Sequence, residues 1–325
     1  MISTESGSIR LFRVSGIQVL LHWSWLLVAW WQISTRRGFY DSVWWNVAEY
    51  LSLFAIVLLH EFGHAFASRQ VGGESREILL WPFGGIAFVK VPPRPGAELW
   101  SIAAGPLVNV VLWPLLGGAF LLLAPPEARG LLWNISGIFT RDRESILTVL
   151  SLPELQRFLV TMYHINLLVL IFNLLPIYPL DGGQMLRSLL WFRFGRAVSL
   201  QVATAIGFVG VGALIVRAVI NYSLFSGLMA LFLAQQCLIG WRHGRSLRAL
   251  ERIPRHVGFR CPTCRQAPPG GPAWLCESCG SRFDPFSTRG LCPHCQAPQT
   301  RTSCPHCGAA HPLEAWEGDG SHPSG

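Results

Sequence analysis

The sequence predicts an α-helical polytopic membrane protein with about six transmembrane helices, a small β-hairpin and a C-terminal zinc-ribbon tail. Composition is the first observation: 51% of the 325 residues are hydrophobic and only 14% are charged, whereas soluble domains carry about 25% charged residues. The second is a series of apolar runs close to the ~20 residues that cross a bilayer as a helix. The third is that eight of the nine cysteines form four Cys-x-x-Cys pairs after residue 260.

The apolar runs set the expected order of membrane spans. We place them at residues 16–33, 46–68, 99–123, 158–180, 198–219 and 223–241. Arginine and lysine gather after the second, fourth and sixth runs, and such residues favour the cytoplasmic side of a membrane. We therefore expect an integral, multi-pass protein in the plasma membrane of a prokaryote, with both termini in the cytoplasm.

Two short apolar runs lie between the second and third spans. Residues 78–83 and 86–89 are too short to cross a bilayer, and they flank the pair Gly84-Gly85, which is typical of a tight turn. We expect a β-hairpin here. It could simply pack on the helix ends, or its edge strand could pair with the extended backbone of another polypeptide.

The second span contains His60, Glu61 and His64 within an apolar run. Histidines four residues apart lie on one face of a helix, which suits two corners of a tetrahedral zinc site. Glu61 lies beside them and could take a proton from a zinc-bound water without occupying its coordination position. The alternative is a set of hydrogen-bonded core side chains. Ionisable groups at membrane depth cost about 2.5 to 3.5 kcal/mol each, so three of them require a partner such as a metal.

Two later segments are expected to lie near these histidines. In the third span, Gly105 allows close helix approach and Asn109 can hydrogen-bond across the contact, so we expect this segment to pack against the histidine helix. The fourth span ends in two prolines and a glycine pair, which present Asp181 at a broken helix end. Because spans two and four run in the same direction, His60, His64 and Asp181 should lie at a similar depth.

With these motifs, the chain resembles the site-2 protease family of intramembrane zinc metalloproteases, in the branch without a PDZ domain. The resemblance rests on His-Glu-Phe-Gly-His at residues 60–64, the Gly-Pro to Asn segment at 105–109, and the Asn to Gly segment at 173–182. It covers residues 10–195. It implies a membrane-embedded zinc endopeptidase that cleaves another membrane protein within or near the bilayer, in regulated intramembrane proteolysis.

The same resemblance assigns roles to individual residues. It implies that His60, His64 and Asp181 bind a catalytic zinc ion and that Glu61 is the catalytic base. It also implies that Asn173 supports the reacting carbonyl group, although a buried asparagine there could instead only brace the broken helix.

The C-terminal cysteine pairs predict two structural zinc sites. If consecutive pairs combine, the first ribbon uses Cys261, Cys264, Cys276 and Cys279, and the second uses Cys292, Cys295, Cys304 and Cys307. So short a segment lacks a core and needs metal to fold. Including the catalytic site, we expect one catalytic and two structural zinc ions per chain.

These predictions divide the chain into four parts. They are a membrane domain at residues 1–241, a basic juxtamembrane amphipathic linker at 242–260, two zinc ribbons at 261–310 and a disordered tail at 311–325. The linker repeats arginine every three or four residues, which favours contact with anionic lipid over nucleic acid. The expected partners are a membrane-protein substrate, anionic lipid and a regulatory partner at the ribbons.

Two other functions fit parts of the sequence. A non-catalytic membrane scaffold would hold zinc only for structure and recruit a partner through its ribbons. Glu61 argues against this, because a closed structural site has no use for that carboxylate. A membrane-tethered nucleic-acid binder would use the ribbons and arginines, and a strong salt dependence of binding would be its signature.

Overall fold

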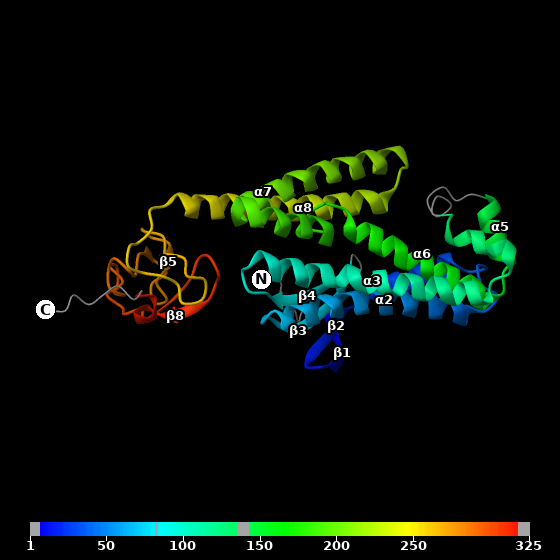
Figure 1. The fold of residues 1–325 in the computed structure, drawn as a ribbon, viewed down its shortest axis with the longest axis horizontal. Coiled ribbons are helices and arrows are strands. Elements are labelled where there is room, and N and C mark those ends of the chain that lie inside the picture. Colours follow the sequence, from blue (N-terminus) through cyan, green and yellow to red (C-terminus); the bar gives the residue numbers. More distant parts are fainter. Residues whose placement is uncertain (1–6, 82–83, 135–142, 318–325) are drawn as a thin grey trace. The chain divides into compact units, whose positions relative to one another are not determined.

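The computed structural model describes residues 7–81, 84–134 and 143–317 of the chain (Figure 1). Two compact units form. Unit 1 comprises Met1–Leu189 and Ala203–Cys237, and unit 2 comprises Leu190–Val202 and Leu238–Gly325.

Four helices in the described parts are long and apolar enough to cross a membrane. They are α2 (Val43–Gln70), α3 (Pro95–Leu123), α6 (Glu154–Leu174) and α7 (Asp181–Ile220). Helix α3 packs against both α2 and α6, and the three lie side by side in Figure 1. The protein itself buries less than half of each apolar window, so the remaining apolar surface suits lipid. The chain is an integral membrane protein.

The first predicted span, residues 16–33, is wrong as a single helix. Its residues form strand β2 (Ile17–His22) and helix α1 (Ser24–Thr35). Helix α1 has 12 residues and is therefore about 18 Å long, too short for a hydrocarbon core of about 30 Å. Ile17 and Val19 are fully buried, so the apolar run of β2 contributes to the core beside the sheet.

The sixth predicted run lies in α8 (Leu224–Arg252), and the count of six spans is not confirmed.

A four-stranded sheet in the order β1-β2-β3-β4 lies against α2. Strands β1 (Ser8–Val14) and β2 are antiparallel, β2 and β3 (Glu74–Trp81) are parallel, and β3 and β4 (Gly84–Lys90) are antiparallel. The predicted hairpin is confirmed as β3–β4, but the predicted position of its turn is wrong. Gly84 and Gly85 belong to β4, where they pair with Trp81 and Leu80 of β3. Because β4 is the last strand in the order, one of its edges has no neighbouring strand in the described part of the chain.

The predicted break after the fourth span is also present. Helix α6 ends at Leu174 and α7 begins at Asp181. The turn between them is tight, because a Cβ atom on Gly182 would lie 2.3 Å from the Leu174 carbonyl oxygen. Helix α7 is itself interrupted at Gly195, where φ is 76°. On the other side of unit 1, the 3-10 helix η1 (Pro126–Leu132) and helix α5 (Arg143–Ser151) precede α6.

Small hairpins build the C-terminal part of unit 2. Strand β5 (Trp274–Leu275) pairs with β6 (Arg282–Phe283), and β7 (Arg301–Ser303) pairs with β8 (Ala310–Pro312), which the 3-10 helix η2 (Leu313–Trp316) follows. The predicted disordered tail is therefore wrong for residues 311–317. Trp316 is fully buried and packs on Phe286, which fixes that segment. Residues 318–325 lie outside the described residues.

Candidate metal centre

Two histidines of α2 and the first residue of α7 converge inside unit 1. His60 Nε2 lies 3.0 Å and His64 Nε2 lies 3.4 Å from Asp181 Oδ2, and the two Nε2 atoms are 3.1 Å apart. Four ligands at about 2.0 to 2.1 Å from a zinc ion lie about 3.3 Å from one another. The three ligand atoms therefore have the spacing of a zinc site.

The hydrogen bonds of both imidazoles favour a bound cation. His60 Nδ1 donates to Asn109 Oδ1 over 2.6 Å, and His64 Nδ1 donates to the Ser101 carbonyl over 2.8 Å. In neutral rings the Nε2 atoms then carry lone pairs, and both face each other and a carboxylate oxygen. Such an arrangement is repulsive without a shared cation. The donor set thus fits zinc.

Asn166 of α6 holds Asn109 in place, a contact that the sequence reasoning missed. Asn109 Nδ2 donates to Asn166 Oδ1 over 2.8 Å, and Asn166 Nδ2 donates to the Asn109 carbonyl over 3.0 Å. Both side chains are fully buried. The sequence does contain a signal for this contact, because Asn166 is a polar side chain in the middle of the apolar run 158–180. Asn109 does pack α3 against α2, as expected, and it also orients His60.

Gly105 leaves the space in which the two imidazoles meet. A Cβ atom there would lie 2.3 Å from His64 Nε2 and 2.8 Å from His60 Nε2. Any larger residue would push its side chain into the ligand atoms themselves. The glycine of the third span therefore serves the metal centre as well as helix packing.

Glu61 lies beside the ligands and against strand β4. It is buried, and its Oε2 accepts a hydrogen bond from the Ala87 N–H over 3.2 Å. A Cβ atom on Gly85 would lie 2.2 Å from Glu61 Cγ. Because Ala87 is paired with Ile78 of β3 yet donates to Glu61, its N–H points toward the unpaired edge of β4.

Asn173 and His164 are two further polar side chains of α6. Asn173 is in the last turn of the helix and half-buried, and its role stays a prediction. His164 of α6 hydrogen-bonds the Leu131 carbonyl over 3.1 Å and is not in the metal-ligand group.

The eight paired cysteines form two further groups, but the consecutive pairing was wrong. The outer site combines Cys261, Cys264, Cys304 and Cys307, and the inner site combines Cys276, Cys279, Cys292 and Cys295. Sulfur atoms facing each other are 3.6 to 3.7 Å apart, close to the ~3.8 Å expected in a tetrahedral zinc-thiolate site. The physical reason is a core of Trp274, Phe286 and Trp316, which packs with Cys261 and Cys304 and brings the first and last pairs together.

Comparisons with known proteins address the part of the chain that holds the histidines. Residues 48–217 match the profile of peptidase family M50. Zinc metalloprotease MJ0392 of Methanocaldococcus jannaschii is 34% identical over 202 residues, which are 62% of this chain and 50% of that relative. Stage IV sporulation protein FB of Bacillus subtilis is 29% identical over 212 residues, 64% of each chain. The solved site-2 protease from Methanocaldococcus jannaschii is 27% identical, with a TM-score of 0.49 over 72% of this chain and 95% of that chain. The chain thus spans half the length of the first of these relatives.

Proposed function

The chain belongs to peptidase family M50, and we propose that it is an intramembrane zinc endopeptidase acting on another membrane protein. The observation that carries the proposal is the meeting of His60, His64 and Asp181 at one point, with Glu61 beside them. A structural zinc site closes its fourth position with another protein ligand, whereas a catalytic site leaves it open. Among the described residues, three side chains form this group.

In this proposal His60, His64 and Asp181 hold the zinc. When bound, zinc supplies a Lewis acid that polarises a peptide carbonyl and makes water acidic enough to lose a proton near neutral pH. Glu61 accepts that proton while the water oxygen adds to the carbonyl carbon. As the C–N bond breaks, Glu61 returns the proton to the leaving amine nitrogen. The Ala87 N–H holds one oxygen of Glu61, which fixes the carboxylate during both transfers.

Strand β4 supports a way to present the substrate. A peptide bond inside a helix is hidden by side chains and its own hydrogen bonds, so the substrate must be locally extended. The unpaired edge of β4 carries the Ala87 N–H beside Glu61. An extended segment could add to this edge as a further strand, which would bring its backbone next to the proposed base.

The remaining features of the proposal concern the surroundings of the protein. We propose a role in regulated intramembrane proteolysis in a prokaryotic plasma membrane, with cytoplasmic termini and a regulatory partner at the cysteine sites. The basic linker would contact anionic lipid. Its arginines on α8 support this, because Arg242, Arg245, Arg248 and Arg252 are all exposed.

The test is Glu61→Gln, which keeps the shape of the side chain but removes the base. Membrane proteins that accumulate uncut in cells carrying this variant are candidate substrates. With one of them purified, cleavage should fall by about 10² to 10⁴-fold, and the variant should keep its zinc. Glu74→Gln is the matched control, because Glu74 is exposed and pairs with Arg76 on β3. Wild-type cleavage by Glu61→Gln would remove Glu61 from the chemistry, and an unchanged pattern of membrane proteins would favour the scaffold.

A further inference from the structure

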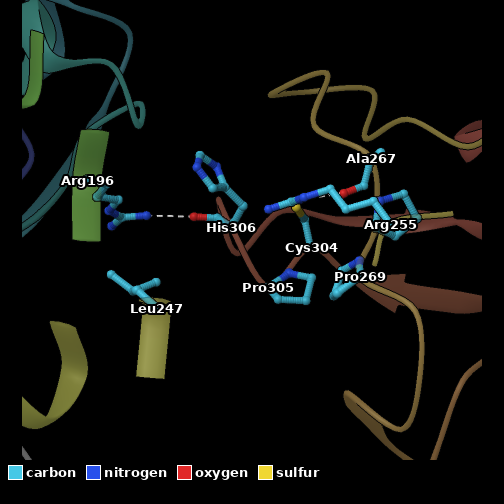
Figure 2. A pocket seen from close by; sticks show the side chains of 9 residues that line it. Arg196, Leu247, Arg255, Ala267, Pro269, Cys304, Pro305 and His306 are labelled. Atoms are coloured by element: carbon cyan, nitrogen blue, oxygen red, sulfur yellow. Dashed lines mark hydrogen bonds between the residues drawn. The ribbon is translucent and has the colours of Figure 1, made fainter. Parts of the chain in front are cut away.

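A pocket in unit 2 contains two arginines without a carboxylate partner. Figure 2 shows Arg196 of α7 and Arg255, which follows α8, on two sides of the Cys304 to His306 turn of the outer site. Leu247 and Pro269 line the pocket with apolar surface. In the parts of the chain that the structure describes, no aspartate or glutamate forms an ion pair with either arginine. The pocket therefore carries two positive charges that no acidic side chain balances.

Among the described residues each guanidinium donates one hydrogen bond, and that of Arg196 also lies 5.5 Å from the centre of the Trp191 ring. Arg196 Nη1 donates to the His306 carbonyl over 2.6 Å, the dashed line in Figure 2, and Arg255 Nη1 donates to the Ala267 carbonyl over 2.6 Å. Arg196 Nε and His306 Nδ1 are buried and have no partner among the described residues. Because a buried polar atom without a hydrogen-bond partner is destabilising, these atoms indicate a missing polar ligand. Because no carboxylate among the described residues pairs with either arginine, the expected ligand is an anion.

The position of these residues in the chain indicates where the anion comes from. Arg196 comes directly before residues 197–220, the apolar part of the candidate membrane helix α7. Leu247 lies five residues beyond Arg242, the first of the exposed arginines that follow the apolar part of α8. Residues that flank membrane spans lie at the level of the lipid headgroups. Acidic phospholipids present their phosphate groups and a net negative charge at that level.

We propose that this pocket binds the headgroup phosphate of one anionic phospholipid. The planar fork of an arginine matches the oxygens of a phosphate group, and the leucine and proline walls suit the glycerol and upper acyl carbons. This is a defined site, distinct from general attraction between lipid and the exposed arginines of α8. It does not depend on the proposed peptidase activity.

The competing explanation is local charge balance. A zinc ion with four thiolates carries a net charge of −2, and Arg196 and Arg255 could simply neutralise the outer site. In that case their loss would weaken zinc binding and leave lipid binding unchanged. The two explanations therefore predict opposite outcomes for the same variant.

The experiment uses the full chain, purified with zinc in a zwitterionic detergent. The affinity for short-chain phosphatidylglycerol is measured by thermophoresis, beside short-chain phosphatidylcholine and inorganic phosphate. The variant Arg196→Gln/Arg255→Gln should bind phosphatidylglycerol at least about tenfold more weakly. The control Arg242→Gln/Arg245→Gln removes the same charge from exposed positions and should change this affinity less than about threefold. Zinc content, measured by elemental analysis, should be equal in all three proteins.

Several outcomes would overturn the proposal. Equal losses in both double variants would mean diffuse electrostatic attraction. Loss of zinc from the pocket variant with unchanged lipid affinity would mean charge balance of the outer site. Inorganic phosphate that binds as tightly as phosphatidylglycerol would mean a site for a soluble anion, and equal affinity for phosphatidylcholine would mean that the two arginines do not select an anionic headgroup.

Discussion

Asn166 should control the affinity of the membrane site for zinc although it touches no ligand atom of that site. Its amide orients Asn109, whose Oδ1 accepts the hydrogen of His60 Nδ1. Asn166→Leu keeps the approximate volume of the side chain and removes both hydrogen bonds to Asn109. The Asn109 amide then loses its acceptor in a fully buried position, at a cost of about 1 to 3 kcal/mol. It can relieve that cost by turning away from His60.

The expected effect follows from that loss of orientation. Partners of metal-binding histidines typically contribute 10 to 100-fold to metal affinity or activity, and this range corresponds to about 1.4 to 2.7 kcal/mol. The hydrogen-bond cost and the affinity range therefore agree. We expect the zinc concentration for half-maximal cleavage to rise about 10 to 100-fold in Asn166→Leu.

The assay measures substrate cleavage in buffers of fixed free zinc, so the thiolate sites do not contribute to the readout. Asn46→Leu is the matched control. Asn46 is buried and lies fourteen residues before His60 on α2, about 21 Å away along the helix. It should leave the zinc dependence unchanged. An unchanged zinc dependence in Asn166→Leu, or an equal shift in both variants, would refute the role of the asparagine pair.

Three further predictions concern the metals. Gly105→Ala should abolish zinc binding at the membrane site, because its methyl group would lie 2.3 Å from His64 Nε2. In the control Gly118→Ala, on the same helix, the added methyl group meets nothing within 4 Å, so this variant should behave as wild type. Elemental analysis of zinc and a cleavage assay test both variants. Cys261→Ser/Cys304→Ser should lower the zinc content by one ion, since both cysteines belong to the outer site; a loss of two ions would restore the consecutive pairing. A mild chelator should abolish cleavage before it unfolds unit 2, because closed thiolate sites couple zinc binding to folding. Circular dichroism during the chelator titration measures the unfolding.

The parts of the site that sequence could predict are those with local geometry. His60 and His64 lie four residues apart on one helix, so their shared face follows from helical periodicity alone. The hairpin is equally local, because two runs too short to cross a bilayer lie next to each other in sequence, although the glycine pair belongs to β4 and not to the turn. Asp181 is far from the histidines in sequence. Its position near them could be predicted only from the direction of two spans and from the family resemblance. The link from Asn166 to Asn109 depends on which faces of α3 and α6 meet, and periodicity in one chain does not contain that information.

Two of the errors, the first span and the cysteine pairing, have related causes. Ile17, Val19 and Leu20 of strand β2 are buried, and so short an apolar run has no period that separates strand from helix. Consecutive pairing of the cysteines assumed that neighbours in sequence are neighbours in space. Spacing alone allows several combinations of four pairs, and the packing of Trp316 and Phe286 decides among them.

The nesting of one cysteine site inside the other gives the tail a preferred order of assembly. Cys264 and Cys304 of the outer site are 40 residues apart, whereas Cys279 and Cys292 of the inner site are 13 apart. The inner site therefore closes the shorter loop, and once closed it roughly halves the length of free chain that the outer site must enclose. Each halving of a loop lowers its closure free energy by about 0.6 kcal/mol. Metal loading is thus expected to be sequential and cooperative, so that the turn contacting Arg196 is the last part of the tail to take its final form.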